Sequence, residues 1–252
     1  MFAYNFLKKH VSQDRKVAIL KWINRLSAPI PNQPLKVIAL RKGTDKLLHG
    51  YIEHYARHFV AFRHLPINIL EIGVGGYDDP RAGGNSLRMW QEYFPKAMIY
   101  SMDIYDKRPL EEARIKIFRG SQNDPEFLEW VVKQIGRIDI IIDDGSHISE
   151  HIITSFNSLF PHLADGGWYV IEDLYNSYST EAGGNSDDLN DPNTSVSMLK
   201  RRLDGLQHNF IHTRSADYYD QNVAAMHCYP KIVFILKGKN DQLFPPQTTR
   251  SA

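Results

Sequence analysis

Four carboxylates follow directly on two short apolar runs, at the places where buried strands are expected to end. They are Asp143, Asp144, Glu172 and Asp173. Such a group would repel itself unless a cation neutralised it, and oxygen ligands without a thiolate select a hard ion. We therefore expect Asp144, Glu172 and Asp173 to bind magnesium, with manganese or calcium as alternatives. Ordinary capping acids at strand ends are the competing interpretation.

Asp143 and His147 flank the expected metal ligand Asp144. Because successive side chains of a strand point to opposite faces, Asp143 is expected nearer a cofactor. His147 comes three residues after Asp144. A metal lowers the pKa of a hydroxyl, and a histidine with a pKa near neutrality can accept the released proton. His147 and Asp144 are thus the expected catalytic pair, and a structural histidine is the alternative.

The segment from His147 to His151 also matches the H-x-x-E-H pattern of metal hydrolases. That pattern requires a helix, so that both histidines face one zinc ion. Here His147 follows a strand pattern and an Asp-Gly turn, which disfavours a helix at this point. A metal-dependent hydrolase that uses His147 and His151 is kept as an alternative function.

A glycine-rich turn ends the first apolar run, and its residues favour a nucleotide-like ligand. Gly73 and Gly75 permit a tight turn through which backbone amides approach a ligand closely. Asp78 stands where the dinucleotide fingerprint requires a small residue. Because its carboxylate would oppose a pyrophosphate, an NAD-linked oxidoreductase is disfavoured.

Acidic and amide side chains near this turn indicate which nucleoside is bound. Asp103 ends the second apolar run, where a carboxylate can accept hydrogen bonds from both ribose hydroxyls. With Glu71 before the turn, this acidic setting fits adenosine that carries a cationic tail, as in S-adenosylmethionine. Gln122 follows the third run and is expected to bond the adenine edge. A helix cap at Asp103 and a plain turn at Gln122 are the alternatives.

Short apolar runs alternate with helical patterns, which predicts a doubly wound α/β fold with a mostly parallel sheet. The runs are Ile67–Ile72, Met98–Asp103, Ile115–Phe118, Ile138–Asp143, Trp168–Ile171 and Ile232–Leu236. The stretch Asn209–Leu236 should close the sheet with an antiparallel edge. Ligands of such sheets bind outside the carboxyl ends of the strands, so the acidic groups should share one rim.

The remaining segments are expected to be helices, connectors and a loop. Residues 1–27 have the spacing of one or two amphipathic helices, and Ala28–Pro34 is a connector. Asp45–Phe59 is predicted as a helix whose aromatic face packs inward, with a cofactor contact as the alternative. Glu181–Asn193 has the composition of a mobile surface loop, and it is either a lid or merely a long loop. We thus predict an N-terminal helical extension with a linker (1–40), one catalytic domain (41–240) and a tail (241–252).

Composition limits the partners of this chain. The 252 residues are 42% hydrophobic and carry 30 basic and 29 acidic residues, a formal charge of +1. This balance gives no strong field for nucleic acid or an anionic membrane. Cys228 is a lone cysteine, and neither a signal peptide pattern nor a membrane-spanning run is evident. We expect a soluble, cytoplasmic protein with a small-molecule partner.

Several segments resemble the macrolide-sugar type of metal-dependent O-methyltransferases. They are GTDK at Gly43–Lys46, LEIGVGG, GGNSLRMWQEYFP, DDGSH and IEDL, and the match runs from about Arg41 to Leu236. The resemblance implies a class I Rossmann-like methyltransferase fold with a seven-stranded sheet. It also implies S-adenosylmethionine- and magnesium-dependent methylation of a hydroxyl on a sugar or glycosylated natural product. A non-catalytic S-adenosylmethionine-binding protein is the alternative, because fold does not dictate function.

The resemblance also assigns residues. It implies that Asp144, Glu172 and Asp173 are metal ligands and that His147 is the base. Positions that line the cofactor pocket by resemblance are Glu71, Gly73, Ser86, Asp103 and Gln122. The macrolide enzymes carry a large additional N-terminal domain that helps them assemble. We therefore take over the reaction and not a macrolide acceptor, and formation of a homo-oligomer is left open.

Overall fold

The computed structural model describes residues 32–241, and the chain divides into two compact units between Ile138 and Asp139. The predicted helices in residues 1–27 and most of the tail lie outside the described residues. Seven strands form one sheet in the order β3-β2-β1-β4-β5-β7-β6. Their bounds are β1 Asn68–Ile72, β2 Met98–Asp103, β3 Ile115–Arg119, β4 Ile138–Asp143, β5 Leu163–Ile171, β6 Val223–Tyr229 and β7 Ile232–Lys237.

The strand directions show a mixed sheet with the predicted parallel pairs and the predicted antiparallel edge. β2 pairs in parallel with both β1 and β3, whereas β7 runs antiparallel to both β5 and β6. β6 is the strand that the apolar runs did not predict. It is an edge strand with a mixed burial pattern, so its sequence lacks the continuous apolar character of a fully buried strand.

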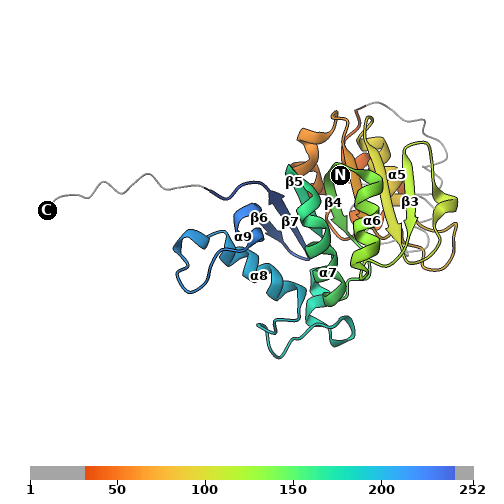
Figure 1. Ribbon diagram of the computed structural model, residues 1–252. Coiled ribbons are helices and arrows are strands. Elements are labelled where there is room, and N and C mark those ends of the chain that lie inside the picture. Colours follow the sequence, from red (N-terminus) through yellow and green to blue (C-terminus); the bar gives the residue numbers. More distant parts are fainter. Residues whose placement is uncertain (1–31, 242–252) are drawn as a thin grey trace, which may run out of the picture. The chain divides into compact units, whose positions relative to one another are not determined.

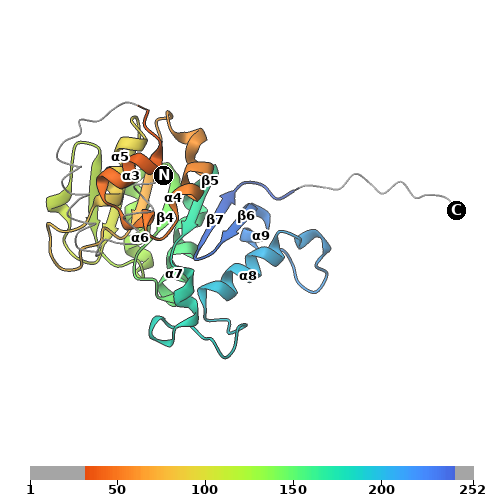
Figure 2. The same cartoon turned by 180° about the vertical axis from the view of Figure 1, so that it is seen from behind.

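In the first unit, helices lie on both faces of β1 to β3. Figures 1 and 2 show α6 on one face and α3, α4 and α5 on the other. The bounds are α3 Leu35–Lys42, η1 Asp45–Leu47, α4 Ile52–Phe59, η2 Val60–Phe62, α5 Asn85–Tyr93, η3 Arg108–Leu110 and α6 Pro125–Ile135. The start of α6 follows from its sequence, because the Asp124 side chain accepts from two backbone amides and proline occupies the first turn.

The predicted helix over Asp45–Phe59 is interrupted. The chain forms η1, turns at Gly50 with a φ of 84°, and only then enters α4. Glycine accommodates this left-handed turn without steric cost, whereas it weakens a helix interior. The predicted aromatic packing is confirmed, because Tyr55 and Phe59 are fully buried and lie 4.9 and 5.8 Å from the Trp90 ring.

Two features of the structure concern the predicted domain bounds. The expected boundary at residue 40 falls inside α3, a helix with only a weak amphipathic pattern. The expected single domain over 41–240 contains the division at Ile138. No helix within residues 32–241 is long and apolar enough to cross a bilayer.

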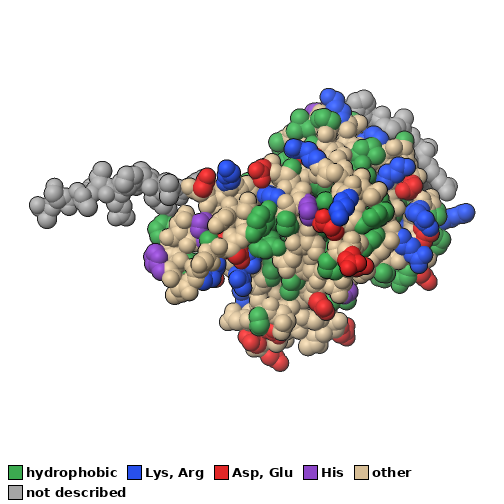
Figure 3. Space-filling model, in the orientation of Figure 1, with side chains coloured by type: hydrophobic (Ala, Val, Ile, Leu, Met, Phe, Trp, Pro, Cys, Tyr) green, Lys and Arg blue, Asp and Glu red, His purple; other side chains and the backbone are tan. Residues whose placement is uncertain are grey.

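In the second unit, α8 contacts both α7 and α9 (Figure 1). The helices are α7 Ser149–Leu159, η4 Phe160–His162, η5 Leu174–Tyr178, η6 Thr180–Ala182, α8 Ser195–Gly205, η7 His208–Phe210 and α9 Tyr218–Asn222. The predicted loop Glu181–Asn193 is built from local turns in which Asn185 donates to Asp191. Acidic side chains lie on the surface of this loop (Figure 3). A lid function for this loop stays a prediction.

Candidate active site

Three of the predicted site residues come together in the second unit. Asp144, His147 and Asp173 each offer one ligand atom, and these atoms all lie within 4.8 Å of one another. The Nε2 atom of His147 lies 4.0 Å from Oδ1 of Asp144 and 3.6 Å from Oδ2 of Asp173. The two carboxylates offer the oxygen ligands that a hard divalent cation prefers, and the imidazole lies beside them. We call these three residues the acidic trio.

The backbone bends sharply at two members of the acidic trio. His147 has a φ of 60° and Asp173 a φ of 53°. This left-handed region is uncommon for residues other than glycine, and such conformations cluster at functional sites. The bends direct two side chains that follow different strands toward the same place.

Asp143 supports the loop that carries Asp144. Its side chain is 2% exposed and accepts a 2.5 Å hydrogen bond from the hydroxyl of Ser155 on α7. Burial, and then the nearby Asp143 carboxylate, raise the pKa of Tyr169 well above its usual value. The expected approach of Asp143 to a cofactor stays a prediction.

Glu172 lies next to Asp173 but outside the acidic trio. It is almost fully buried, and its backbone N–H donates to the carbonyl of Asp143 over 3.0 Å, which ties the ends of β4 and β5 together. Its role as a third carboxylate ligand stays a prediction.

The hydrolase alternative does not find its helix. α7 begins at Ser149, so His147 precedes the helix and only His151 lies on it. The Nδ1 atom of His151 instead lies 2.9 Å from the hydroxyl oxygen of Ser146. The two histidines therefore do not share a helical face, and the H-x-x-E-H interpretation is wrong for this segment.

In the first unit, the glycine turn after β1 is shaped for close approach of a ligand. Gly73 and Gly75 have φ angles of 96° and 76°. The Asp103 carboxylate lies beside the turn, where Oδ2 accepts from the Val74 N–H and Oδ1 from the Tyr105 N–H, both over 2.9 Å. Each oxygen keeps a further lone pair, so Asp103 can still accept hydrogen bonds from a ribose.

Glu71 has a partner that the sequence analysis did not identify. Its carboxylate is fully buried and forms an ion pair with Nζ of Lys46 over 3.1 Å, and the Lys46 side chain is 1% exposed. Glu71 thus lies inside the unit, two residues before Gly73, and its contact with a cofactor stays a prediction. Lys46 is the lysine of the GTDK segment, so this motif was the feature of the sequence that pointed to Lys46.

The insertion after the turn is a compact cover, held by a buried lysine. The N–H of Gly84 donates to the carbonyl of Val74 over 2.8 Å. Nζ of Lys107 donates to the carbonyls of Asp79 and Ala82 over 2.7 and 3.2 Å, and Lys107 is fully buried. A Cβ atom at Gly83 would lie 2.3 Å from the Gly75 carbonyl oxygen, so the close packing requires glycine there.

The other two expected cofactor residues lie on the same unit. Ser86 is in the first turn of α5 and is partly exposed, whereas Gln122 follows β3 and is 7% exposed. The structure thus keeps Gly73, Gly75, Ser86, Asp103 and Gln122 within one compact unit.

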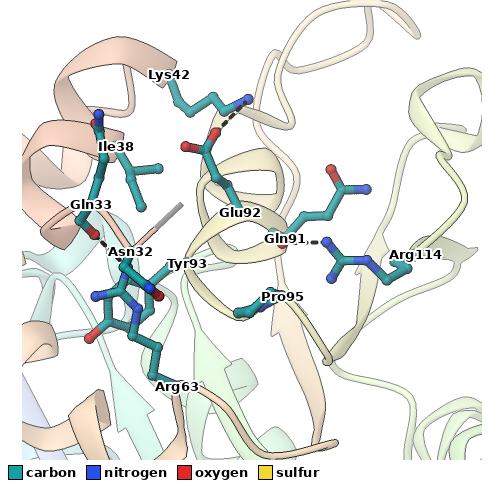
Figure 4. Close-up of a pocket in the computed structure, with 10 residues that line it drawn as sticks. All are labelled: Asn32, Gln33, Ile38, Lys42, Arg63, Gln91, Glu92, Tyr93, Pro95 and Arg114. Atoms are coloured by element: carbon teal, nitrogen blue, oxygen red, sulfur yellow. Dashed lines mark hydrogen bonds and ion pairs between the residues drawn. The ribbon is translucent and has the colours of Figure 1, made fainter. Parts of the chain in front are cut away.

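A separate cavity of about 350 Å³ opens in the first unit, and none of its lining residues is a predicted site residue (Figure 4). Its charged groups are engaged with neighbours. Arg114 donates to the Gln91 carbonyl, Arg63 to the Gln33 carbonyl, and Lys42 pairs with Glu92. These contacts give the charged side chains of the cavity partners within the protein.

Comparison with known proteins gives the chain its relatives, although no family model matches it. Mycinamicin VI 2''-O-methyltransferase of Micromonospora griseorubida is 46% identical over 198 residues, which are 77% of this chain and 50% of the relative. A tetracenomycin-C rhamnosyl 2'-O-methyltransferase of Streptomyces olivaceus is 46% identical over 207 residues, 81% of this chain and 54% of the relative. The chain is a homologue of these O-methyltransferases.

The fold of this methyltransferase homologue also matches a solved structure. The MycE methyltransferase of mycinamycin biosynthesis, solved with Mg, SAH and mycinamycin VI, matches with a TM-score of 0.82 and 43% identity. The match covers 87% of this chain and 57% of MycE. The predicted class I Rossmann-like methyltransferase fold is confirmed. The homologue spans about half the length of the curated relatives that it matches.

Proposed function

We propose that this protein is an S-adenosylmethionine- and magnesium-dependent O-methyltransferase that acts on a hydroxyl of a sugar or glycosylated natural product. The acidic trio is the observation that carries the proposal, because it brings together two carboxylates that can bind a divalent metal, Asp144 and Asp173, and a histidine that can act as a base, His147. The relatives support the reaction class, since their names specify O-methylation and MycE was solved with Mg and SAH.

The second unit would hold the metal and remove a proton. Asp144 and Asp173, with Glu172 beside them, would be the carboxylate ligands. When bound, magnesium lowers the pKa of an acceptor hydroxyl. The Nε2 atom of His147 would accept the hydroxyl proton. S-adenosylmethionine would supply the methyl group: the acceptor oxygen would form a bond to the methyl carbon, and the carbon–sulfur bond would break with its electron pair on the sulfur of S-adenosylhomocysteine.

The first unit would bind S-adenosylmethionine. The turn at Gly73 and Gly75 would bring backbone amides close to the ligand, and Ser86 lies in the helix that follows it. Asp103 would accept hydrogen bonds from the ribose, while Gln122 would bond the adenine edge. Glu71 and Lys46 would support the turn from below.

Calorimetry tests this proposal at its first step. We expect the protein to bind S-adenosylhomocysteine with a dissociation constant below about 1 mM, which corresponds to a binding free energy of about −4 kcal/mol. It should bind NAD more weakly. A protein that binds neither ligand, or NAD alone, would not be a methyltransferase. Methylation of a glycoside then separates the enzyme from a non-catalytic S-adenosylmethionine-binding protein.

Three further expectations belong to this proposal. The acceptor is a small glycoside, in keeping with the near-neutral charge of +1. The protein acts in the cytoplasm, where a lone cysteine such as Cys228 stays reduced. Formation of a homo-oligomer is tested by light scattering after size-exclusion chromatography.

A further inference from the structure

Two exposed tyrosines lie on the 3-10 helix that directly follows Asp173. Tyr175 is 52% exposed and Tyr178 is 45% exposed, and both lie on η5. A 3-10 helix has three residues per turn, so residues 175 and 178 lie on the same side of it. Two residues advance about 4 Å along such an axis, which keeps Tyr175 close to Asp173 of the acidic trio.

The inner side of η5 is anchored, so the tyrosines are held at the surface. The Ser177 side chain is buried, lies in hydrogen-bond contact with the Ser195 hydroxyl, and accepts from the Val196 N–H over 3.2 Å. The side-chain amide of Asn176 donates to the Asp173 carbonyl over 3.2 Å. An anchored segment that presents two aromatic rings to solvent offers a contact surface for a ligand.

A lysine lies beside this pair. Lys231 occupies the turn between β6 and β7 with a φ of 71°, and its carbonyl accepts from the Leu174 N–H over 2.9 Å. Its Nζ atom lies 5.9 Å from the centre of the Tyr175 ring. The hairpin turn is thus fixed to the segment that follows Asp173, and it places an ammonium donor next to an aromatic face.

We propose that Tyr175, Tyr178 and Lys231 form a platform for the sugar ring of the acceptor. The apolar face of a pyranose carries C–H bonds that match the electron-rich face of a tyrosine ring, whereas its hydroxyls project from the rim. Lys231 would donate a hydrogen bond to one of these oxygens. The platform would hold the ring so that a neighbouring hydroxyl reaches the acidic trio.

This inference rests on the proposed function and names where its acceptor binds. One result distinguishes a sugar-binding role of Tyr175 from a purely structural role. Loss of the Tyr175 ring should weaken binding of the glycoside and leave binding of S-adenosylhomocysteine unchanged, because Gly73, Asp103 and Gln122 lie on the other compact unit.

The chain offers a matched control in Tyr218. Its side chain is 42% exposed, and Nζ of Lys237 lies 5.9 Å from its ring, so it too is an exposed tyrosine with an ammonium group near its ring. Tyr218 lies on α9 and is not part of the acidic trio. A general effect of removing an exposed tyrosine would therefore appear in Tyr218→Ala as well.

The experiment uses the full chain with magnesium and two probes, mycinamicin VI and p-nitrophenyl α-L-rhamnopyranoside. Saturation-transfer NMR with S-adenosylhomocysteine present reports binding of the sugar ring, and methylation kinetics give KM and kcat. We expect Tyr175→Ala to raise KM for the accepted probe about tenfold, with a smaller change in kcat. Tyr175→Phe should retain wild-type KM, and Lys231→Met should raise KM by a smaller factor.

Several results would overturn the platform. One is a KM in Tyr175→Ala that equals that of the wild type or of Tyr218→Ala. Another is an equal loss of S-adenosylhomocysteine affinity in Tyr175→Ala, which would indicate a structural role. A wild-type protein that binds S-adenosylhomocysteine but neither probe would also contradict it. A wild-type protein that does not bind S-adenosylhomocysteine contradicts instead the proposed function itself.

Discussion

The imidazole Nε2 of His147 lies 3.6 Å from a carboxylate oxygen of Asp173, although the two residues follow different strands of the sheet. Both have left-handed backbones, with φ angles of 60° and 53°. The chain therefore adopts an uncommon conformation at two separate turns, and both turns direct a predicted site residue to the same point. This relationship supports a base and a metal ligand that act on one hydroxyl.

Removal of the metal should stop methyl transfer while the protein stays folded. Asp144→Ala takes one carboxylate from the acidic trio, and a chelator removes the ion itself. We expect both to abolish turnover without changing the circular dichroism spectrum, and excess magnesium to restore the chelated wild type only. Asp187→Ala, in the exposed acidic loop, is the control. Full activity in the chelator would exclude a metal-dependent mechanism.

His147→Ala should separate chemistry from cofactor binding. Loss of a general base lowers kcat by about 10²- to 10⁴-fold, whereas the affinity for S-adenosylhomocysteine should stay unchanged. His151→Ala removes a histidine of the same segment that lies outside the acidic trio, and its kcat should fall by less than about tenfold. Equal kcat values for His147→Ala and the wild type would remove His147 from the mechanism.

Lys46→Met should destabilise the first unit through its partner Glu71. The substitution leaves a buried carboxylate without its ion pair, which costs about 3–5 kcal/mol in the free energy of unfolding. The double variant Lys46→Met with Glu71→Gln should recover most of this loss, because no buried charge remains. Urea unfolding followed by fluorescence measures both.

A surface ion pair provides the control for that measurement. Lys36 and Glu53 lie 2.6 Å apart with side chains 55% and 69% exposed. Lys36→Met should therefore change stability by about 1 kcal/mol or less. Equal losses in Lys36→Met and Lys46→Met would show that the buried pair has no special role.

Lys107→Met should weaken cofactor binding by freeing the loop that covers the glycine turn. Two carbonyl contacts of the buried ammonium, to Asp79 and Ala82, would be lost. We expect the S-adenosylhomocysteine dissociation constant, measured by calorimetry, to rise about tenfold, the equivalent of one or two hydrogen bonds. Lys133→Met, at a side chain that is 68% exposed, should leave it unchanged. An unaltered constant in Lys107→Met would show that the loop does not contribute to this site.

Acid should weaken the start of α9. Burial opposes ionisation of Asp220, but hydrogen bonds from Arg214 and the Asp217 N–H outweigh it, so the pKa of Asp220 is lowered. The resulting stability is present above the unfolded pKa near 3.8 and is lost as the pH falls through the lower folded pKa. We expect Asp220→Asn to lower the free energy of unfolding by about 1–3 kcal/mol at pH 7. Below about pH 4, near the unfolded pKa, the stability of the variant should approach that of the wild type. A difference that stays constant from pH 7 to pH 3 would contradict this.

The sequence predicted those parts of the fold and site that depend on local pattern. Continuous apolar runs identify β2 and β4 with their observed bounds, because strands buried on both faces leave that signature. The edge strand β6 lacks it. Acidic residues after β4 and β5 could be placed at strand ends for the same reason, and Asp144 and Asp173 do meet His147 there.

Contacts between distant segments could not be predicted in this way. The pairing of Lys46 with Glu71 joins residues 25 positions apart, and no periodicity specifies it. The contact between Asp143 and Ser155 could not be predicted either, because strand alternation gives two faces but does not say which face meets Ser155. The left-handed backbones of His147 and Asp173 have no compositional signal, since neither residue is glycine.

The central claim is that the acidic trio uses a divalent metal to direct methyl transfer to a sugar hydroxyl. The most direct test is mass spectrometry of mycinamicin VI and p-nitrophenyl α-L-rhamnopyranoside after incubation with the protein and methyl-labelled S-adenosylmethionine, with magnesium or with chelator. We predict that one labelled methyl group appears on a glycoside oxygen with magnesium and that none appears with chelator or with Asp144→Ala. Label transfer at the same rate in chelator, or from Asp144→Ala, would contradict the account.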